Sequence, residues 1–225
     1  MSRTEADPGN SGSFDGGSID RPRIEAAIAE ILAAIGEDPT RPGLASTPQR
    51  VAQAYGEFFS GLAVDPLSHL DGSAEFAEGS DGLGELVILR DIDFRSICEH
   101  HLLPFVGVAH IAYVPRTRIV GLGKLPRVVE TLASRPQLQE RLTEEIADAI
   151  QRGLDPLGVL VVLDATHGCV TVRGARQLHS STVTVASRGT LAESVERAEA
   201  MTLIGAPSAR RKTPARRKAP AGREK

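Results

Sequence analysis

The sequence predicts an α+β domain in which helices accompany antiparallel strands. Three observations predict it. Apolar residues recur at helical spacing near the start and in the middle of the chain. Runs rich in β-branched residues lie between and after these segments. Turn residues separate neighbouring runs, as expected for antiparallel pairs. Helices combined with antiparallel pairs indicate the α+β class.

The composition is that of a globular protein. The 225 residues allow one sizeable domain or two small ones, and a hydrophobic content of 41% is ordinary. No apolar run approaches the length of a membrane span, and the polar N-terminus has no signal-peptide core. Two cysteines cannot form a disulfide framework, and a metal-binding thiolate needs reducing conditions. We therefore expect a cytoplasmic protein with no membrane contact.

The charge distribution divides the chain into three parts. We expect a disordered leader at residues 1–19, a folded domain at 20–205 and a basic disordered tail at 206–225. From Pro207 onward, eight Lys and Arg residues face one Glu, although the whole chain has a net charge of −3. Such a tail attracts nucleic acid or another polyanion, or is simply a solvated extension. We favour the second interpretation because no aromatic residues interleave the charges.

Two helices are predicted before residue 61. Asp20 can cap the first, Pro22 suits its first turn, and the apolar stripe ends at Gly36. A Thr-Pro pair opens the second helix, over residues 47–60. Residues 61–85 are rich in Gly, Asp and Ser and contain no Lys or Arg, so we expect an irregular surface connection there.

Strand character begins at residues 86–92 and continues at 105–114. A turn at 115–118 then sends the chain back through 119–120, which predicts a hairpin between the last two runs. The rest of the chain predicts helices at 125–134 and 136–152, strands at 159–163 and 182–185, and a final helix at 191–204.

One short stretch concentrates the chemistry. Cys98 and His101 stand in C-x-x-H spacing, so both side chains can reach one metal ion, and Cys169 is a third candidate ligand. Thiolate and imidazole ligands are typical of zinc, and three protein ligands leave a position for a catalytic water. His100 and His167 flank these ligands and could transfer protons. The alternative is that both cysteines are small buried hydrophobic residues.

Three cations and one carboxylate complete the candidate site. Lys124 and Arg127 share a face if a helix begins there, and Arg173 lies close to Cys169. Three cations near a hydrolytic metal suggest a substrate with several phosphates, although each alone fits ordinary surface charge. Glu140 points away from the apolar stripe of its own helix, so it is either solvated or reaches a neighbouring subunit's site.

Two other chemistries are excluded by the sequence. Residues 121–125 (GLGKL) lack both the glycine spacing of a phosphate-binding loop and the Ser or Thr that would hold magnesium. No G-x-S-x-G nucleophile elbow of a serine hydrolase occurs.

The assembled motifs resemble the GTP cyclohydrolase I family. The resemblance lies in residues 37–51, in CEHHLLPF at 98–105, in QLQERLT at 137–143 and in the H-x-C motif that begins at His167. It spans about residues 20–205, in order. It implies a T-fold (tunnelling fold) subunit whose sheets close into a shared barrel, and a homodecamer of two pentamers with sites between subunits.

The resemblance also implies a reaction and residue roles. GTP and water would give 7,8-dihydroneopterin triphosphate and formate, the first step of folate or other pterin synthesis. The implied roles are zinc ligation by Cys98, His101 and Cys169, proton transfer by His100 and His167, guanine binding by Gln139 and Glu140, and triphosphate binding by Lys124, Arg127 and Arg173.

The chain departs from the family pattern at Gly123, where the family usually has a serine thought to assist late steps. Val170 and Val172 replace common methionines. Two alternatives therefore stay open. One is a divergent paralogue that stops after purine ring opening or uses a related nucleotide. The other is a non-catalytic zinc-containing T-fold subunit.

Overall fold

The computed structural model describes residues 18–75 and 85–206. The predicted leader and basic tail lie almost wholly outside these ranges, so their predicted disorder stays a prediction. No helix within the described ranges is long and apolar enough to cross a membrane.

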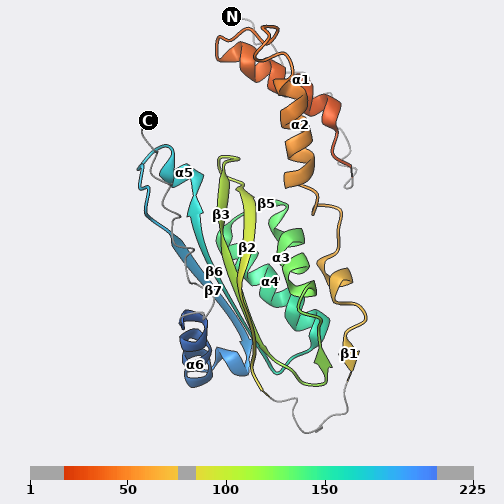
Figure 1. Ribbon diagram of the computed structural model, residues 1–225, viewed down its shortest axis with the longest axis vertical. Coiled ribbons are helices and arrows are strands. Elements are labelled where there is room, and N and C mark those ends of the chain that lie inside the picture. Colours follow the sequence, from red (N-terminus) through yellow and green to blue (C-terminus); the bar gives the residue numbers. More distant parts are fainter. Residues whose placement is uncertain (1–17, 76–84, 207–225) are drawn as a thin grey trace, which may run out of the picture.

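The two N-terminal helices form where the sequence predicts them. Helix α1 spans Arg21–Ala34 and helix α2 spans Thr47–Phe58. The Asp20 carboxylate accepts a hydrogen bond from the Arg23 backbone amide at 3.1 Å, which confirms the predicted cap. The helices pack on one another, and Figure 1 shows them beyond one end of the sheet. No residue of α1 is fully buried, and Ile31 is 53% exposed, so α2 covers the apolar stripe of α1 only in part.

A five-stranded sheet forms the centre of the molecule, with the strand order β5-β2-β3-β6-β7. Its strands are β2 (Val87–Cys98), β3 (Pro104–Val114), β5 (Pro136–Gln137), β6 (Gly158–His167) and β7 (Thr182–Gly189). The four long strands pair antiparallel, and only the short β2–β5 pair is parallel. This arrangement confirms the predicted α+β class with an antiparallel sheet (Figure 1).

The predicted hairpin between residues 105–114 and 119–120 is wrong. Strand β3 pairs with β2 on one side and with β6 on the other, so both of its edges are occupied by longer strands. Strand β4 (Arg118–Ile119) pairs instead with β1 (Ala74–Glu75). The connection at 61–85 is therefore partly regular, because it also contains the 3₁₀ helix η1 (Pro66–Leu70), which Asp65 caps.

Helices α3 (Lys124–Ala133) and α4 (Gln139–Leu154) cover one face of the sheet, as Figure 1 shows. The predicted inward stripe of α4 is confirmed, because Leu142, Ile146 and Ile150 are fully buried in the main core. The helix begins at residue 139 rather than at 136, since Pro136 and Gln137 extend the sheet as β5 beside Ile97 and Cys98.

A smaller hydrophobic core lies on the other face of the sheet, under the last two helical elements of the described chain. These are the 3₁₀ helix η2 (Thr190–Ala192) and helix α6 (Ser194–Gly205), which together replace the single predicted helix. The Arg90 guanidinium donates to the backbone carbonyls of Leu203 at 2.9 Å and Ala206 at 2.7 Å, and so fixes the C-terminal end of α6 on the sheet.

Candidate metal and catalytic site

The loop between β2 and β3 carries the first candidate ligands. Cys98 ends β2 and is 5% exposed, and its backbone closes the turn through hydrogen bonds with Leu102 and Leu103, both at 2.9 Å. His100 and His101 lie on the tip of this turn, with exposed side chains and nearly perpendicular rings 6.3 Å apart. A tight turn therefore presents both imidazoles to solvent just beyond a buried thiol.

Strand pairing brings the second cysteine to this loop. Strand β3 pairs with β6 so that Phe105 lies opposite His167, and the short helix α5 (Gly168–Thr171) follows directly. The Cys169 and Cys98 thiols are close enough to interact. Burial raises the pKa of the Cys169 thiol, the neighbouring Cys98 thiol raises it further, and the Arg173 guanidinium opposes the shift.

The two thiols are only part of the predicted ligand set. Among the described residues, no three His, Cys, Asp or Glu side chains are arranged as a complete metal site. His101 therefore does not join the two thiols in this conformation, although it lies on the turn that Cys98 begins. The donor chemistry fits zinc, because two adjacent thiols with one nearby imidazole match its preferred ligands and a bound cation would favour their thiolate forms.

His167 is held from two sides. Its ring stacks on the buried Phe105 ring, with centroids 4.7 Å apart and planes 1° from parallel. Its Nε2 atom lies 2.7 Å from the side-chain oxygen of Gln139, the first residue of α4. Burial lowers the pKa of His167, and the nearby Glu140 carboxylate opposes this shift. The neutral imidazole, which can accept a proton, is therefore favoured at neutral pH.

The two predicted substrate-binding residues at the start of α4 differ in their surroundings. Gln139 is 1% exposed, and its side chain binds within the subunit to His167 and to strands β6 and β7. Sequence reasoning missed this use of the side chain. Glu140 is exposed, as its position on the helix predicts, yet it lies near enough to His167 to influence that residue's pKa. Glu140 therefore remains available to a ligand outside the subunit core.

The three predicted cations do not all gather at this end of the molecule. Arg173 lies near Cys169. Lys124 begins α3, whereas the other end of α3 leads into β5 beside Cys98, so the length of the helix separates Lys124 from the thiols. The Lys124 ammonium donates to the Asp71 backbone carbonyl. One subunit alone therefore does not assemble the predicted phosphate-binding cations around the predicted metal.

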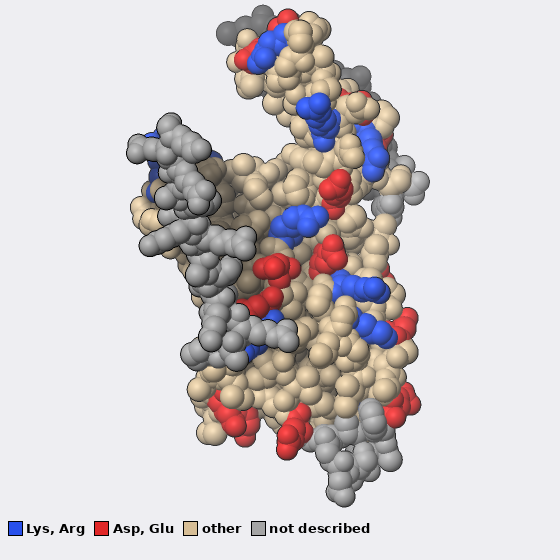
Figure 2. All heavy atoms as spheres, in the orientation of Figure 1, with Lys and Arg blue, Asp and Glu red and all other residues tan. Residues whose placement is uncertain are grey.

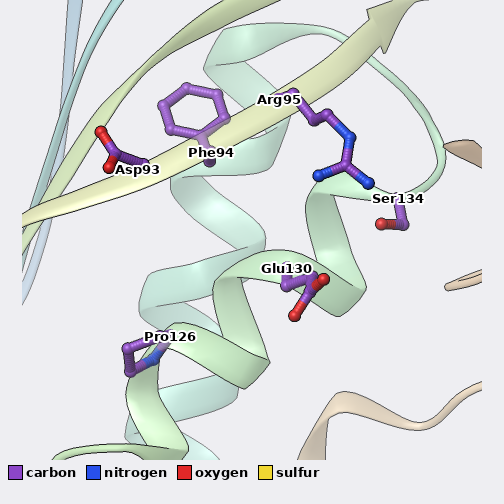
Figure 3. A pocket seen from close by; sticks show the side chains of 6 residues that line it. All are labelled: Asp93, Phe94, Arg95, Pro126, Glu130 and Ser134. Atoms are coloured by element: carbon purple, nitrogen blue, oxygen red, sulfur yellow. The ribbon is translucent and has the colours of Figure 1, made fainter.

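Arg127 lines a cavity of about 400 Å³ between the N-terminal connection and α3. A second cavity, of about 200 Å³, lies between β2 and α3 (Figure 3). Its lining residues are Asp93, Phe94, Arg95, Pro126, Glu130 and Ser134, none of which is a predicted site residue. Figure 2 shows positive and negative side chains interspersed on the face in view, without a patch of one sign.

A polar network connects the loop between β2 and β3 to α4, and sequence reasoning missed it too. The Arg141 guanidinium forms an ion pair with Glu99 and donates to the Gln137 side-chain oxygen at 3.1 Å. The Glu99 backbone amide donates to the Gln137 carbonyl at 3.1 Å. Since Glu99 directly follows Cys98, the network fixes the direction in which the loop leaves β2.

We expect Arg141→Met to lower zinc affinity about 10- to 100-fold, because groups that orient metal ligands typically contribute that much. Competition with a chromophoric chelator measures the affinity. Arg152→Met is the matched control, since Arg152 lies on the same helix and bonds only locally, to Asp148. Equal zinc affinities in the two variants would contradict this role for Arg141.

Comparisons with known proteins identify the family of this chain. The sequence profile of the family described as GTP cyclohydrolase I matches residues 24–205. A protein of Leifsonia xyli subsp. xyli named GTP cyclohydrolase 1 is 60% identical over 191 residues, which are 85% of this chain and 98% of that protein. Proteins of the same name from Carboxydothermus hydrogenoformans and Clostridioides difficile are 55% and 53% identical, each over 83% of this chain and 96% and 97% of their own lengths. The chain therefore belongs to the GTP cyclohydrolase I family of enzymes.

Proposed function

We propose that this chain catalyses the zinc-dependent hydrolysis and rearrangement of GTP to 7,8-dihydroneopterin triphosphate and formate. This would be the first step of folate or pterin synthesis in the cytoplasm. The observation that carries the proposal is the juxtaposition of the Cys98 and Cys169 thiols beside an oriented His167, in a chain that matches the family from residue 24 to 205.

In this proposal Cys98, His101 and Cys169 would hold zinc. Bound zinc would supply Lewis acidity that activates water for hydrolysis. His167, fixed against Phe105, exchanges protons with the purine during ring opening, and His100 serves the same purpose from the loop. The Glu140 carboxylate accepts hydrogen bonds from the guanine edge.

The proposal includes an assembly in which subunits share each site. Glu140 faces outward, and Lys124 and Arg127 lie towards the end of α3 remote from the thiols of their own subunit. A second copy could supply these cations to the triphosphate, with Arg173 from the first. Among the described residues, strand β7 has no partner on its outer edge, and β2 pairs on its outer side only at Ile97 and Cys98. These edges suit a T-fold barrel, and we propose a decamer of two pentamers.

GTP turnover by zinc-loaded protein tests the proposal. Formate and, after oxidation, pterin fluorescence are recorded in the same sample. Both signals together are the expected result. Formate without pterin would instead favour a paralogue that stops after ring opening. Neither signal, in protein that retains zinc, would favour the non-catalytic subunit.

The role of Gly123 has its own test. A Cβ atom built on Gly123 meets no heavy atom within 4 Å, and the residue caps α3 with an ordinary negative φ of −68°. We expect Gly123→Ser to fold with little change in unfolding free energy, because the backbone angles of residue 123 suit any residue and the added side chain meets nothing. If the missing hydroxyl limits the late steps, the ratio of pterin to formate rises.

Gly121→Ser is the matched control, since a Cβ there also meets nothing within 4 Å and Gly121 lies two residues before the cap. An unchanged product ratio in Gly123→Ser would show that the chain completes the reaction without that hydroxyl.

A further inference from the structure

We propose that Gln139 is a positioning residue that fixes His167 in the tautomer with its proton on Nε2, so that Nδ1 is the nitrogen that exchanges protons with the substrate. The role of this tautomer in catalysis rests on the proposed function. The tautomer itself follows from contacts within the subunit.

The surroundings of the Gln139 side chain determine which way its amide points. Its nitrogen lies 2.8 Å from the Thr182 carbonyl oxygen and 3.3 Å from the Leu163 carbonyl oxygen. Carbonyl oxygens only accept hydrogen bonds, so the NH₂ group must face them. The opposite orientation would place the amide oxygen against two carbonyl oxygens. The amide oxygen therefore faces His167.

This orientation determines the proton on His167. The Gln139 oxygen lies 2.7 Å from Nε2, and an amide oxygen can only accept, so Nε2 must carry the donated hydrogen. This hydrogen bond is kept in the neutral ring and in the cation, because Nε2 is protonated in both. Only Nδ1 then gains or loses a proton without breaking this hydrogen bond. No hydrogen bond to Nδ1 is formed within the part of the chain that the structure describes.

Packing makes the arrangement rigid. Gln139 is 1% exposed, and the Thr143 hydroxyl donates to its backbone carbonyl at 2.7 Å. The Thr184 hydroxyl lies 3.2 Å from the Gln139 nitrogen and 2.6 Å from the Thr143 hydroxyl, which joins α4 to β7. The His167 ring lies flat on Phe105, and rotating it by 180° would place a carbon rather than Nε2 against the amide oxygen. The buried oxygen would then lose its donor.

The first test measures the tautomer directly. Magic-angle-spinning ¹⁵N NMR of histidine-labelled protein distinguishes protonated from unprotonated ring nitrogens, and the His167 signals are those absent from His167→Ala. We expect Nε2 protonated and Nδ1 unprotonated in the neutral ring. A neutral ring protonated on Nδ1 would overturn the proposal. This measurement needs no GTP turnover, so its result is separate from that of the proposed function.

The second test is kinetic and uses protein that turns over GTP. We expect Gln139→Met to lower kcat about 10- to 100-fold with little change in KM, since the ring is left free to take the other tautomer. Gln139→Glu should recover most of kcat. Either oxygen of its carboxyl group can accept the hydrogen bond from Nε2. In His167→Ala, Gln139→Met should cost little more, because the effect passes through His167.

Gln151→Met controls for a general loss of stability. Gln151 also lies on α4, is partly buried, and uses its amide nitrogen only to bond the Pro156 carbonyl at 3.2 Å. It should change the melting temperature without changing kcat. If Gln139→Met leaves kcat unchanged, or lowers it equally with and without His167, Gln139 does not act through His167.

Discussion

Replacing Cys169 by serine should abolish the proposed zinc binding and lower kcat/KM for GTP roughly a thousand-fold or more, because a serine hydroxyl does not ionise as a thiol does and the Lewis acid would be lost with it. Cys98→Ser should have the same effect, since the two thiols lie together. Atomic emission spectroscopy after gel filtration measures the zinc, and formate release measures the activity.

Val172→Ser is the control for the cysteine variants. Val172 follows α5 directly and its side chain is 71% exposed, so the substitution alters the same segment without touching the thiols. It should retain zinc and activity. A Cys169→Ser protein that keeps one zinc ion per subunit would rule out this residue as a ligand.

Replacing His167 by asparagine should lower kcat by about 10²- to 10⁴-fold while zinc is retained, as expected for loss of a general acid–base group. Because burial lowers the pKa of His167, its neutral form persists as the pH falls below the ordinary histidine range and is lost only as the pH passes the lowered value. The acidic limb of the wild-type pH–kcat profile should therefore lie below that range, and it should be altered in the variant.

His110→Asn is the matched control for this histidine. His110 lies on β3, where its Nδ1 accepts a hydrogen bond from the Asp91 amide at 3.2 Å, a bond that an asparagine oxygen can also accept. The control should keep kcat and the acidic limb. Full turnover by His167→Asn would exclude His167 from proton transfer.

Caps and apolar periodicity in the sequence predicted the helices and strands better than they predicted which strands pair. Asp20 caps α1 as expected because a cap depends only on residues one turn away. The position of β4 could not be predicted from such signals, since its partner β1 lies more than forty residues earlier in the chain. Residues Pro136 and Gln137 became a strand because Cys98 and its neighbour offered an open edge, which helical periodicity does not reveal.

In the candidate site, too, local sequence patterns predicted some features, whereas contacts made by tertiary packing were not predicted. The spacing of Cys98 and His101 suggested a metal, and the structure brings the distant Cys169 to the first thiol through the β3–β6 pairing. The outward position of Glu140 followed from helix geometry alone. The Gln139–His167 and Arg141–Glu99 contacts could not be predicted, because each joins side chains that only tertiary packing brings together.

The β3–β6 register also sets an order of events during synthesis. Cys98 leaves the ribosome some seventy residues before Cys169, and the two meet only after β6 has aligned on β3 with Phe105 opposite His167. A nascent chain that ends before β6 has one thiol and no partner for it, so the proposed zinc site would form only after this non-local pairing. Under metal limitation, the enzyme would accumulate as a folded chain awaiting its metal, rather than as a metal-loaded folding intermediate.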